Sequence, residues 1–266
     1  MDLGISGRVA FVSGGSMGMG RTSAELLAAE GCRVVVAALP RDKESIDETV
    51  EGIRAAGGEA IGVSGDLTVR DDVEAAVAEA TRAFAAPDIA VVNVNGPPPG
   101  SFEGVTDEQF ALAMDQMVMS TVYLCRAVLP HMREQRWGRI VSLNSVGAKE
   151  PPREVPHALV NPSRAAVIAL NKTLSNEYAE FGITVNTIGT GFIGTDRMYR
   201  GFQVMADGQG RTLDEVLGEI EATIPAGRVG KPDEIAATVA YLCSEGAGYV
   251  NGELINVDGG FHRTAF

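Results

Sequence analysis

Short apolar runs alternate along the chain with longer segments in which apolar residues recur every three or four positions. The runs predict buried strands at residues 8–13, 33–38, 60–65, 89–93, 139–143, 183–188 and 253–257. The periodic segments predict helices at residues 20–30, 45–56, 68–85, 107–136, 161–181, 213–221 and 233–244. Strands that alternate with helices favour βαβ units. We therefore expect an α/β fold, a doubly wound parallel sheet of about seven strands with helices on both faces.

Residues that favour helix ends bound several of these segments. Gly31 and Gly57 follow two helical patterns, where glycine adopts the left-handed backbone that ends a helix. Thr68 is expected to cap the helix that follows it, and Asn161 with Pro162 is expected to form an N-cap and N1 pair. No linker, repeat or low-complexity tract interrupts the pattern, so all 266 residues are interpreted as one domain.

Composition narrows the class of partner. The chain is 45% hydrophobic and carries a net charge of −13, which argues against nucleic acid or an anionic membrane as a partner. No uncharged apolar run is long enough to predict a membrane span. The scattered cysteines Cys32, Cys125 and Cys243 indicate reduced thiols, and the lack of a recognisable leader favours a cytoplasmic location. The three histidines fit no metal-site spacing, so no metal is expected.

A glycine-rich segment from Ser13 to Gly20 follows the first predicted strand and opens the first helix. Its glycines permit a tight turn and a close approach of the backbone to a pyrophosphate, and the helix N-terminus supplies free N–H donors. This placement predicts a Rossmann-like fold that binds a dinucleotide. The same residues match G-x-S-x-G, with Ser16 at the position of a hydrolase nucleophile. Only one strand precedes Ser16 and no Asp and His partners stand at sensible positions, so the hydrolase is the weaker alternative.

Ordered motifs over almost the whole chain resemble those of the short-chain dehydrogenase/reductase family. They are the glycine loop, Asp66-Leu67, Asn93-Val94-Asn95-Gly96, the strand from Arg139 that leads to Ser145, and residues 191–196, 230–236 and 257–260. Within the family the chain looks like a 3-oxoacyl-carrier-protein-reductase-like subgroup with a degenerate catalytic tetrad. The resemblance implies an NAD(P)-dependent oxidoreductase that interconverts a carbonyl and an alcohol on a small-molecule substrate.

Carrying the family's motifs onto this chain gives a set of expected cofactor contacts. These are Gly14, Ser16, Met17, Gly18, Met19, Gly20, Arg41, Asp66, Leu67, Asn93, Asn95, Gly96, Arg164, Gly191, Ile193 and Thr195. The second predicted strand ends without the carboxylate that binds the ribose hydroxyls of NAD. Arg41 and Lys43 follow it and could meet a 2′-phosphate, which favours NADP, with NAD as the alternative. Met17 stands where NADP-preferring members often carry a basic residue.

The resemblance also implies a catalytic tetrad of Asn, Ser, Tyr and Lys, and this chain keeps only part of it. Ser145 occupies the serine position, whereas Met117 stands for the asparagine, Val160 for the tyrosine and Arg164 for the lysine. Valine cannot donate a proton, and arginine keeps its charge near neutral pH. The family's usual proton delivery therefore cannot be carried over intact.

Ser145, His157 and Arg164 are the candidate catalytic residues. Ser145 could polarise a carbonyl, or it could instead satisfy backbone groups at the end of its strand. His157 is the nearest titratable replacement for the missing acid, and a solvated loop histidine is the alternative. The lost tetrad positions leave a second hypothesis open, a catalytically inactive dinucleotide-binding or scaffold protein.

An apolar stretch at residues 114–124 wraps more than one face of its predicted helix, as in a core or an interface. It resembles the helix that pairs across subunits in the family. A homotetramer is expected, with a dimer as the fallback and a buried intrachain helix as the alternative. Residues 195–225 are expected to form a lid over the substrate, whose identity their mixed composition does not give.

Overall fold

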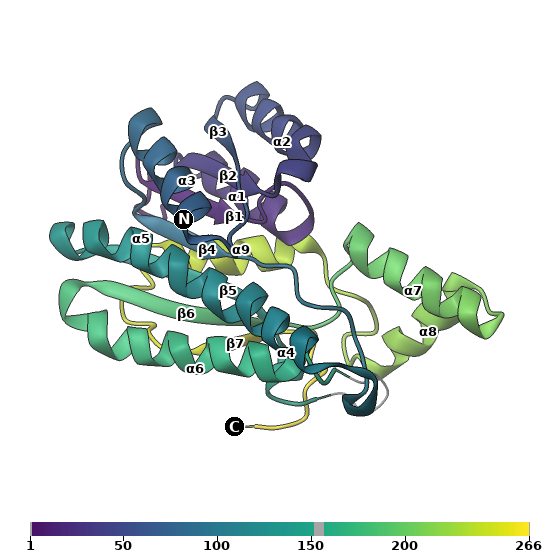
Figure 1. Ribbon diagram of the computed structural model, residues 1–266. Helices are drawn as coiled ribbons and strands as arrows, with labels where there is room; N and C mark the ends of the chain where they lie inside the picture. Colours follow the sequence, from purple (N-terminus) through teal and green to yellow (C-terminus); the bar gives the residue numbers. More distant parts are fainter. Residues whose placement is uncertain (1, 152–156, 266) are drawn as a thin grey trace.

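A parallel sheet forms the centre of the computed structural model, which describes residues 2–151 and 157–265 (Figure 1). The seven strands pair in the order β3-β2-β1-β4-β5-β6-β7, and every pairing is parallel. They are β1 (Val9–Ser13), β2 (Arg33–Ala38), β3 (Glu59–Ser64), β4 (Ile89–Val92), β5 (Gly138–Ser145), β6 (Ile183–Thr190) and β7 (Leu254–Val257). The predicted doubly wound α/β architecture is thereby confirmed.

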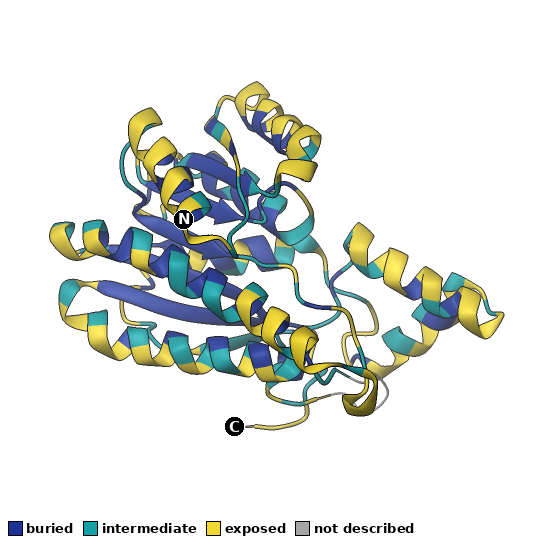
Figure 2. Cartoon of the chain, viewed as in Figure 1, coloured by how far each residue is buried: buried dark blue, intermediate teal, exposed yellow. Residues whose placement is uncertain are grey.

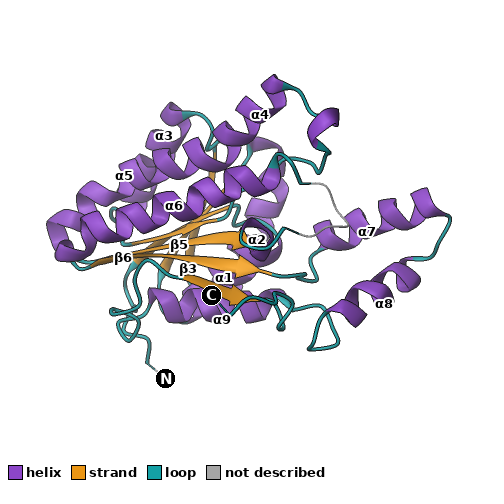
Figure 3. Ribbon diagram, turned by 90° about the horizontal axis from the view of Figure 1, so that it is seen from below, coloured by secondary structure: helices purple, strands orange, loops and turns teal. Residues whose placement is uncertain are grey.

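Helices cover both faces of this sheet (Figure 3). They are α1 (Gly18–Ala29), α2 (Lys43–Ala55), α3 (Arg70–Ala83), α4 (Asp107–Met114), α5 (Ser120–Gln135), α6 (Val160–Tyr178), α7 (Asp196–Gln209), α8 (Leu213–Thr223) and α9 (Pro232–Cys243). The core on one face includes residues of α1, α2 and α9. The core on the other face includes residues of α3 and α5, and α6 lies beside α5 on that side (Figure 3).

Most strands of the sheet are buried on both of their faces (Figure 2), whereas the edge strand β3 has exposed positions. In β1, Ala10 and Val12 contribute to the core beneath α1, whereas Val9 and Phe11 contribute to the core beneath α3 and α5. All five residues of β1 and all eight of β6 are buried. Continuous apolar runs therefore predicted the strands well, although they did not show which face each residue occupies.

Two helix ends match the prediction and two helix starts do not. Gly31 and Gly57 have φ values of +84° and +88° and follow the last residues of α1 and α2, as predicted. The predicted Thr68 cap is wrong, because α3 begins at Arg70 with Val69 at its N-cap. The N–H and hydroxyl of Thr68 instead donate to Asp66 Oδ1, at 2.9 and 2.8 Å. The predicted Asn161 cap is also wrong, because α6 begins at Val160 and places Asn161 inside its first turn.

The segment between β6 and β7 holds two helices where the sequence pattern predicted one. α7 and α8 form a hairpin that projects beyond the end of the sheet (Figure 1). Phe202, Ala206 and Val216 make a small separate core between them. α7 escaped prediction because its polar residues and two glycines, Gly201 and Gly208, obscure this apolar face.

A single helix was predicted over residues 107–136, but the structure divides it. A π-helical segment, Asp115–Met119, joins α4 to α5. π-bulges of this kind occur frequently at functional sites. Met117, where the family resemblance leads one to expect an asparagine, lies within this segment and is 2% exposed.

The three cysteines are free and buried, as predicted. Burial raises the pKa of the Cys32 and Cys125 thiols to about 12 and raises that of Cys243 further, so none is a thiolate at neutral pH. Among residues 2–151 and 157–265, no group of three His, Cys, Asp or Glu side chains is placed to hold a metal ion. In the same ranges no helix has both the length and the apolarity needed to cross a bilayer.

A buried carboxylate ties the sheet to α5 at the edge where the strands begin. Asp88 is 7% exposed, and its Oδ2 accepts a hydrogen bond from Val9 N at 2.9 Å. Its Oδ1 accepts from Gln135 Nε2 at 2.5 Å and lies 3.7 Å from Arg8 Nη1. One side chain therefore accepts hydrogen bonds from β1 and α5 and forms an ion pair with the residue that precedes β1.

We expect Asp88→Ala to lower the free energy of unfolding by about 2 kcal/mol, because it leaves buried donors without acceptors. The melting temperature should fall by roughly 4–8 °C for a chain of this size. Differential scanning calorimetry checks this, with Glu74→Ala, at an exposed carboxylate on α3, as the control. Equal melting temperatures for the two variants would contradict the role given to Asp88.

Candidate active site

A crevice opens where β1 and β4 lie side by side. The chain runs from β1 outward to β2 and β3 before it returns to β4, so the connections leave these two strands in opposite directions. Ligands of open α/β sheets bind at such a switch point, outside the carboxyl ends of the strands. The Ser13 hydroxyl closes the base of the crevice by accepting from Asn93 N at 2.9 Å and donating to Val91 O at 3.2 Å.

The glycine loop turns tightly over this crevice. Gly14 and Gly18 have φ values of +56° and +54°, which favour glycine. A Cβ on Gly20 would lie 2.0 Å from the Gly14 carbonyl oxygen, so α1 approaches the loop too closely for any side chain there. α1 has Met17 at its N-cap, no side-chain cap and no acidic residue in its first turn. Its free N–H groups and dipole therefore suit an anion.

The geometry around Ser16 does not favour the hydrolase alternative. Ser16 is only 2% exposed, whereas a nucleophile needs access to its substrate. The chain's three histidines lie elsewhere: His131 3.4 Å from Asp88, His262 2.6 Å from Asp258, and His157 bridged to Gly100. The Ser–His pairing of an activated serine is therefore not formed.

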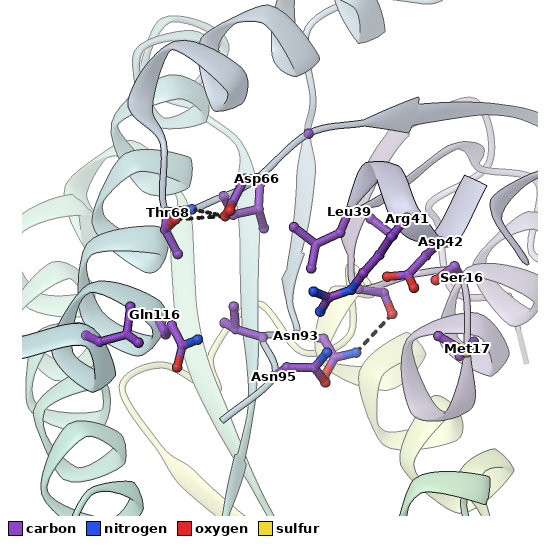
Figure 4. Close-up of a pocket in the computed structure, with 16 residues that line it drawn as sticks. Ser16, Met17, Leu39, Arg41, Asp42, Asp66, Thr68, Asn93, Asn95 and Gln116 are labelled. Carbon is purple, nitrogen blue, oxygen red and sulfur yellow. Dashed lines mark hydrogen bonds between the residues drawn. The ribbon is translucent and has the colours of Figure 1, made fainter. Parts of the chain in front are cut away.

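A cavity of about 280 Å³ lies beside the loop (Figure 4). Eight of the predicted cofactor residues line it: Gly14, Ser16, Met17, Arg41, Asp66, Leu67, Asn93 and Asn95. The prediction missed the other lining residues, which are Ala38, Leu39, Asp42, Gly65, Thr68, Val94, Leu112 and Gln116. Ser145, His157 and Arg164, the three candidate catalytic residues, are not among the residues that line this cavity.

Opposite charges enter the cavity from the short turn after β2. Arg41 and Asp42 both line it, and Figure 4 shows them near Ser16. No acid stands at the end of β2, as the sequence indicated, but the turn that follows brings Asp42 to the cavity. The guanidinium suits a phosphate, and the carboxylate suits ribose hydroxyls. Across the cavity, the two bonds from Thr68 orient the Asp66 carboxylate.

Three predicted cofactor residues, Gly191, Ile193 and Thr195, follow β6, and they are placed in different ways. Thr195 comes close to the glycine loop, with its Cγ2 3.2 Å from where a Cβ on Gly18 would lie. Its hydroxyl also caps α7 by accepting from Met198 N at 3.3 Å. Ile193 is 6% exposed and packs with the core beneath α1, so only its backbone remains for a ligand. Gly191 N donates to Val257 O at 3.1 Å and so ties this segment to β7.

Ser145 ends β5 with its hydroxyl poised to donate. Its Oγ accepts from Gly147 N at 3.1 Å, and its own hydrogen goes to no described residue. Asn144 Oδ1 accepts from Ser145 N at 2.8 Å, while Asn144 Nδ2 donates to Arg164 O at 3.1 Å. Asn144 therefore fixes the position of Ser145 relative to α6.

The start of α6 combines a buried valine with two basic groups. Val160, at the tyrosine position, is 8% exposed. Arg164 lies one turn later, and burial followed by the charge of Arg197 lowers its pKa to about 10, so it stays charged near neutrality. Burial and the charge of Arg164 lower the pKa of His157 below its ordinary 6.5. His157 is half-buried, which makes a fully solvated loop histidine a poor description of it.

Gly96 lies between the catalytic end and the cofactor crevice. A Cβ placed on it would lie 3.4 Å from Arg164 Nη2 and 3.9 Å from Met117 Sδ. Its carbonyl accepts from Arg197 Nη2 at 3.2 Å, and Asn95 Oδ1 accepts from the other terminal nitrogen of Arg197. Sequence reasoning missed Arg197, and its position two residues after Thr195 was the only signal available.

Comparison with known proteins agrees with this geometry. The family model described as enoyl-(acyl carrier protein) reductase matches residues 14–262. The short-chain reductase protein NovJ of Streptomyces niveus is 34% identical over 252 residues, covering 95% of this chain and 93% of that protein. The 3-oxoacyl-[acyl-carrier-protein] reductase FabG of Vibrio cholerae is 33% identical over 261 residues, covering 98% and 99%.

Solved structures extend the likeness to three dimensions. L-Sorbose reductase from Gluconobacter frateurii, complexed with NADPH and L-sorbose, has a TM-score of 0.94 at 30% identity, covering 99% of this chain and 100% of that chain. The matched regions include the glycine loop, the crevice and the catalytic end. The chain therefore belongs to the short-chain dehydrogenase/reductase family.

Proposed function

We propose that the protein is an NADPH-dependent reductase that converts a small carbonyl substrate to an alcohol. The observation that carries this proposal is the intact crevice, with its close-packed glycine loop and the uncapped N-terminus of α1. The relatives support the choice of NADPH, since L-sorbose reductase was solved with it and YwfH, a structural neighbour at 27% identity, is an NADPH-dependent reductase.

The residues present fit this cofactor. The glycine loop and the first turn of α1 would hold the pyrophosphate, because their backbone N–H groups are unfilled. Arg41 would pair with the 2′-phosphate, Asp42 with the ribose and Asp66 with the adenine. Arg164 would meet the second ribose in place of the family's lysine, and Thr195 would contact the carboxamide. When bound, NADPH supplies the hydride.

The chain's own residues would then manage the developing charge on the carbonyl oxygen. Ser145 donates its free hydroxyl hydrogen to that oxygen, which is electrostatic stabilisation by a positioned donor. His157, as the imidazolium, delivers the proton that valine cannot. Arg164 keeps the positive charge beside them and so opposes protonation of His157.

A catalytically inactive cofactor-binding protein is the second candidate. The burial of Val160 and Met117 favours it, because apolar side chains fill two positions that supply proton-handling groups in the family. This candidate shares the crevice, and it differs in predicting cofactor binding without turnover of any carbonyl.

The oligomer we propose is a homotetramer that pairs through α4 and α5. Leu124 and Met117 of the apolar stretch are buried within the chain, but Val118, Met119 and Val122 are only half-buried and Met114 is 38% exposed. This leaves an apolar face for a second subunit. We also propose a cytoplasmic location, which the free, buried thiols support.

Calorimetric titration should show NADPH binding more tightly than NADH. Arg41→Ala should weaken NADPH binding by about tenfold or more, because it removes a charge-assisted contact to the 2′-phosphate, and should leave NADH unchanged. Arg82→Ala is the matched control, since Arg82 is an exposed arginine on α3 that does not line the cavity. Equal losses for NADPH and NADH would remove Arg41 from phosphate recognition.

Carbonyl reduction should slow as the pH rises through the pKa of His157, which lies below 6.5. The proton donor is the imidazolium, and this form is populated only below that pKa. His157→Gln should abolish this limb of the kcat profile, and Ser145→Ala should lower kcat by about 100-fold while keeping the limb. A profile unchanged in His157→Gln would exclude His157 as the proton donor.

Sedimentation equilibrium should give a particle of four times the 27.9 kDa chain mass. Val122→Glu should dissociate it, because a charge would enter the apolar face. Arg126→Glu, at an exposed position of the same helix, serves as the control. A monomeric wild-type protein would contradict the proposed interface, and a dimer would correct its stoichiometry.

A further inference from the structure

Three arginines gather at the catalytic end of a chain that is strongly acidic overall. Arg164 comes from α6, and Arg197 and Arg200 come from the first turns of α7. Arg197 donates to Gly96 O, and Arg164 Nη2 lies 3.4 Å from where a Cβ on Gly96 would stand. The lowered pKa values agree with this proximity, since Arg197 contributes to the shift of Arg164, and Arg200 to that of Arg197.

No described carboxylate neutralises this group. Among residues 2–151 and 157–265, no Asp or Glu oxygen lies within 4.0 Å of the three guanidiniums. Two other arginines near the same hairpin are paired at 2.6 Å, Arg211 with Glu219 and Arg228 with Glu234. Arg164 Nε is buried and has no hydrogen-bond partner in the described chain. Burial makes the unpaired charge of Arg164 costly unless an anion completes it, whereas Arg197 and Arg200 are exposed to solvent.

The cofactor's phosphates already have other partners. The uncapped α1 N-terminus and Arg41 account for the pyrophosphate and the 2′-phosphate, and none of the three arginines lines that cavity. Arg197 is held by two neutral oxygens, Asn95 Oδ1 and Gly96 O, one on each terminal nitrogen. A carboxylate presents two oxygens to the same planar fork and adds a charge.

We propose that the substrate carries a carboxylate besides its carbonyl, and that Arg197 binds this carboxylate in the field of Arg164 and Arg200. The inference rests on the proposed reductase function. Hydride from NADPH forms the new C–H bond at the carbonyl carbon, the π electrons of the C=O bond move to oxygen, and that oxygen takes one proton. NADPH leaves as NADP⁺, and the carboxylate is unchanged.

Matched substrate pairs test the proposal directly. Acetoacetate and pyruvate are compared with their methyl esters by following NADPH oxidation in wild type, Arg197→Gln and Arg82→Gln. Arg82 is an exposed arginine on α3 and is the matched control. We expect wild type to prefer the acids, and Arg197→Gln to lower kcat/KM for them by about 10- to 100-fold, with the esters little changed. Equal use of acids and esters by wild type would overturn the proposal.

A binding experiment keeps the test decisive if none of these four carbonyls is turned over. Protein saturated with NADP⁺ is titrated with malonate and with malonamide. Malonate should bind more tightly, and Arg197→Gln should remove the difference. Equal binding of malonate and malonamide by wild type would overturn the inference. A loss of NADPH affinity in Arg197→Gln as large as its loss of malonate affinity would also overturn it, because the arginines would then bind the cofactor. Failure of wild type to bind NADPH would instead defeat the proposed function.

Discussion

The close approach of two backbones at the crevice is the constraint on which the rest of the structure depends. A Cβ on Gly14 would lie 2.5 Å from Asn93 O, and one on Gly20 would lie 2.0 Å from Gly14 O. Any side chain there would push α1 away from β1 and β4 and misdirect its free N–H groups. Cofactor binding therefore depends mainly on backbone groups. For that reason the geometry of the glycine loop does not depend on which side chains stand at Met117, Val160 and Arg164.

The two altered positions on α6 have linked consequences. In the family the lysine lowers the pKa of a tyrosine, and here the valine leaves no phenol for a cation to act on. Arg164 retains the charge, and its field falls on His157 instead, where it opposes the protonated form. Burial acts in the same direction. The imidazolium of His157 is therefore a stronger acid than a free imidazolium, and this protonated form is less populated at neutral pH.

Sequence patterns predicted the strands because buried parallel strands are apolar on both faces, and the glycine loop because its spacing follows from backbone geometry. Features that depend on three-dimensional folding were missed. Thr68 was expected to cap a helix, but α3 begins two residues later and has Val69 at its N-cap. Asp42 lies beyond a proline turn, outside the strand end where an acid was sought. Arg197 belongs to no motif, and only the packing of α7 brings it to Gly96.

The acidic surface and the cationic catalytic end act on a substrate over different distances. At physiological ionic strength the Debye length is about 8 Å, so most of the net charge of −13 is screened from an approaching anion. Arg164 is half-buried, and its field on a bound group is screened much less. The overall charge therefore has little effect on an approaching anion, whereas the arginines stabilise an anion once it has entered the site. Salt weakens long-range electrostatic steering of the substrate, but the short-range pairing of a bound carboxylate with the arginines persists. The site therefore favours selective binding of a small carboxylate more than a fast association rate.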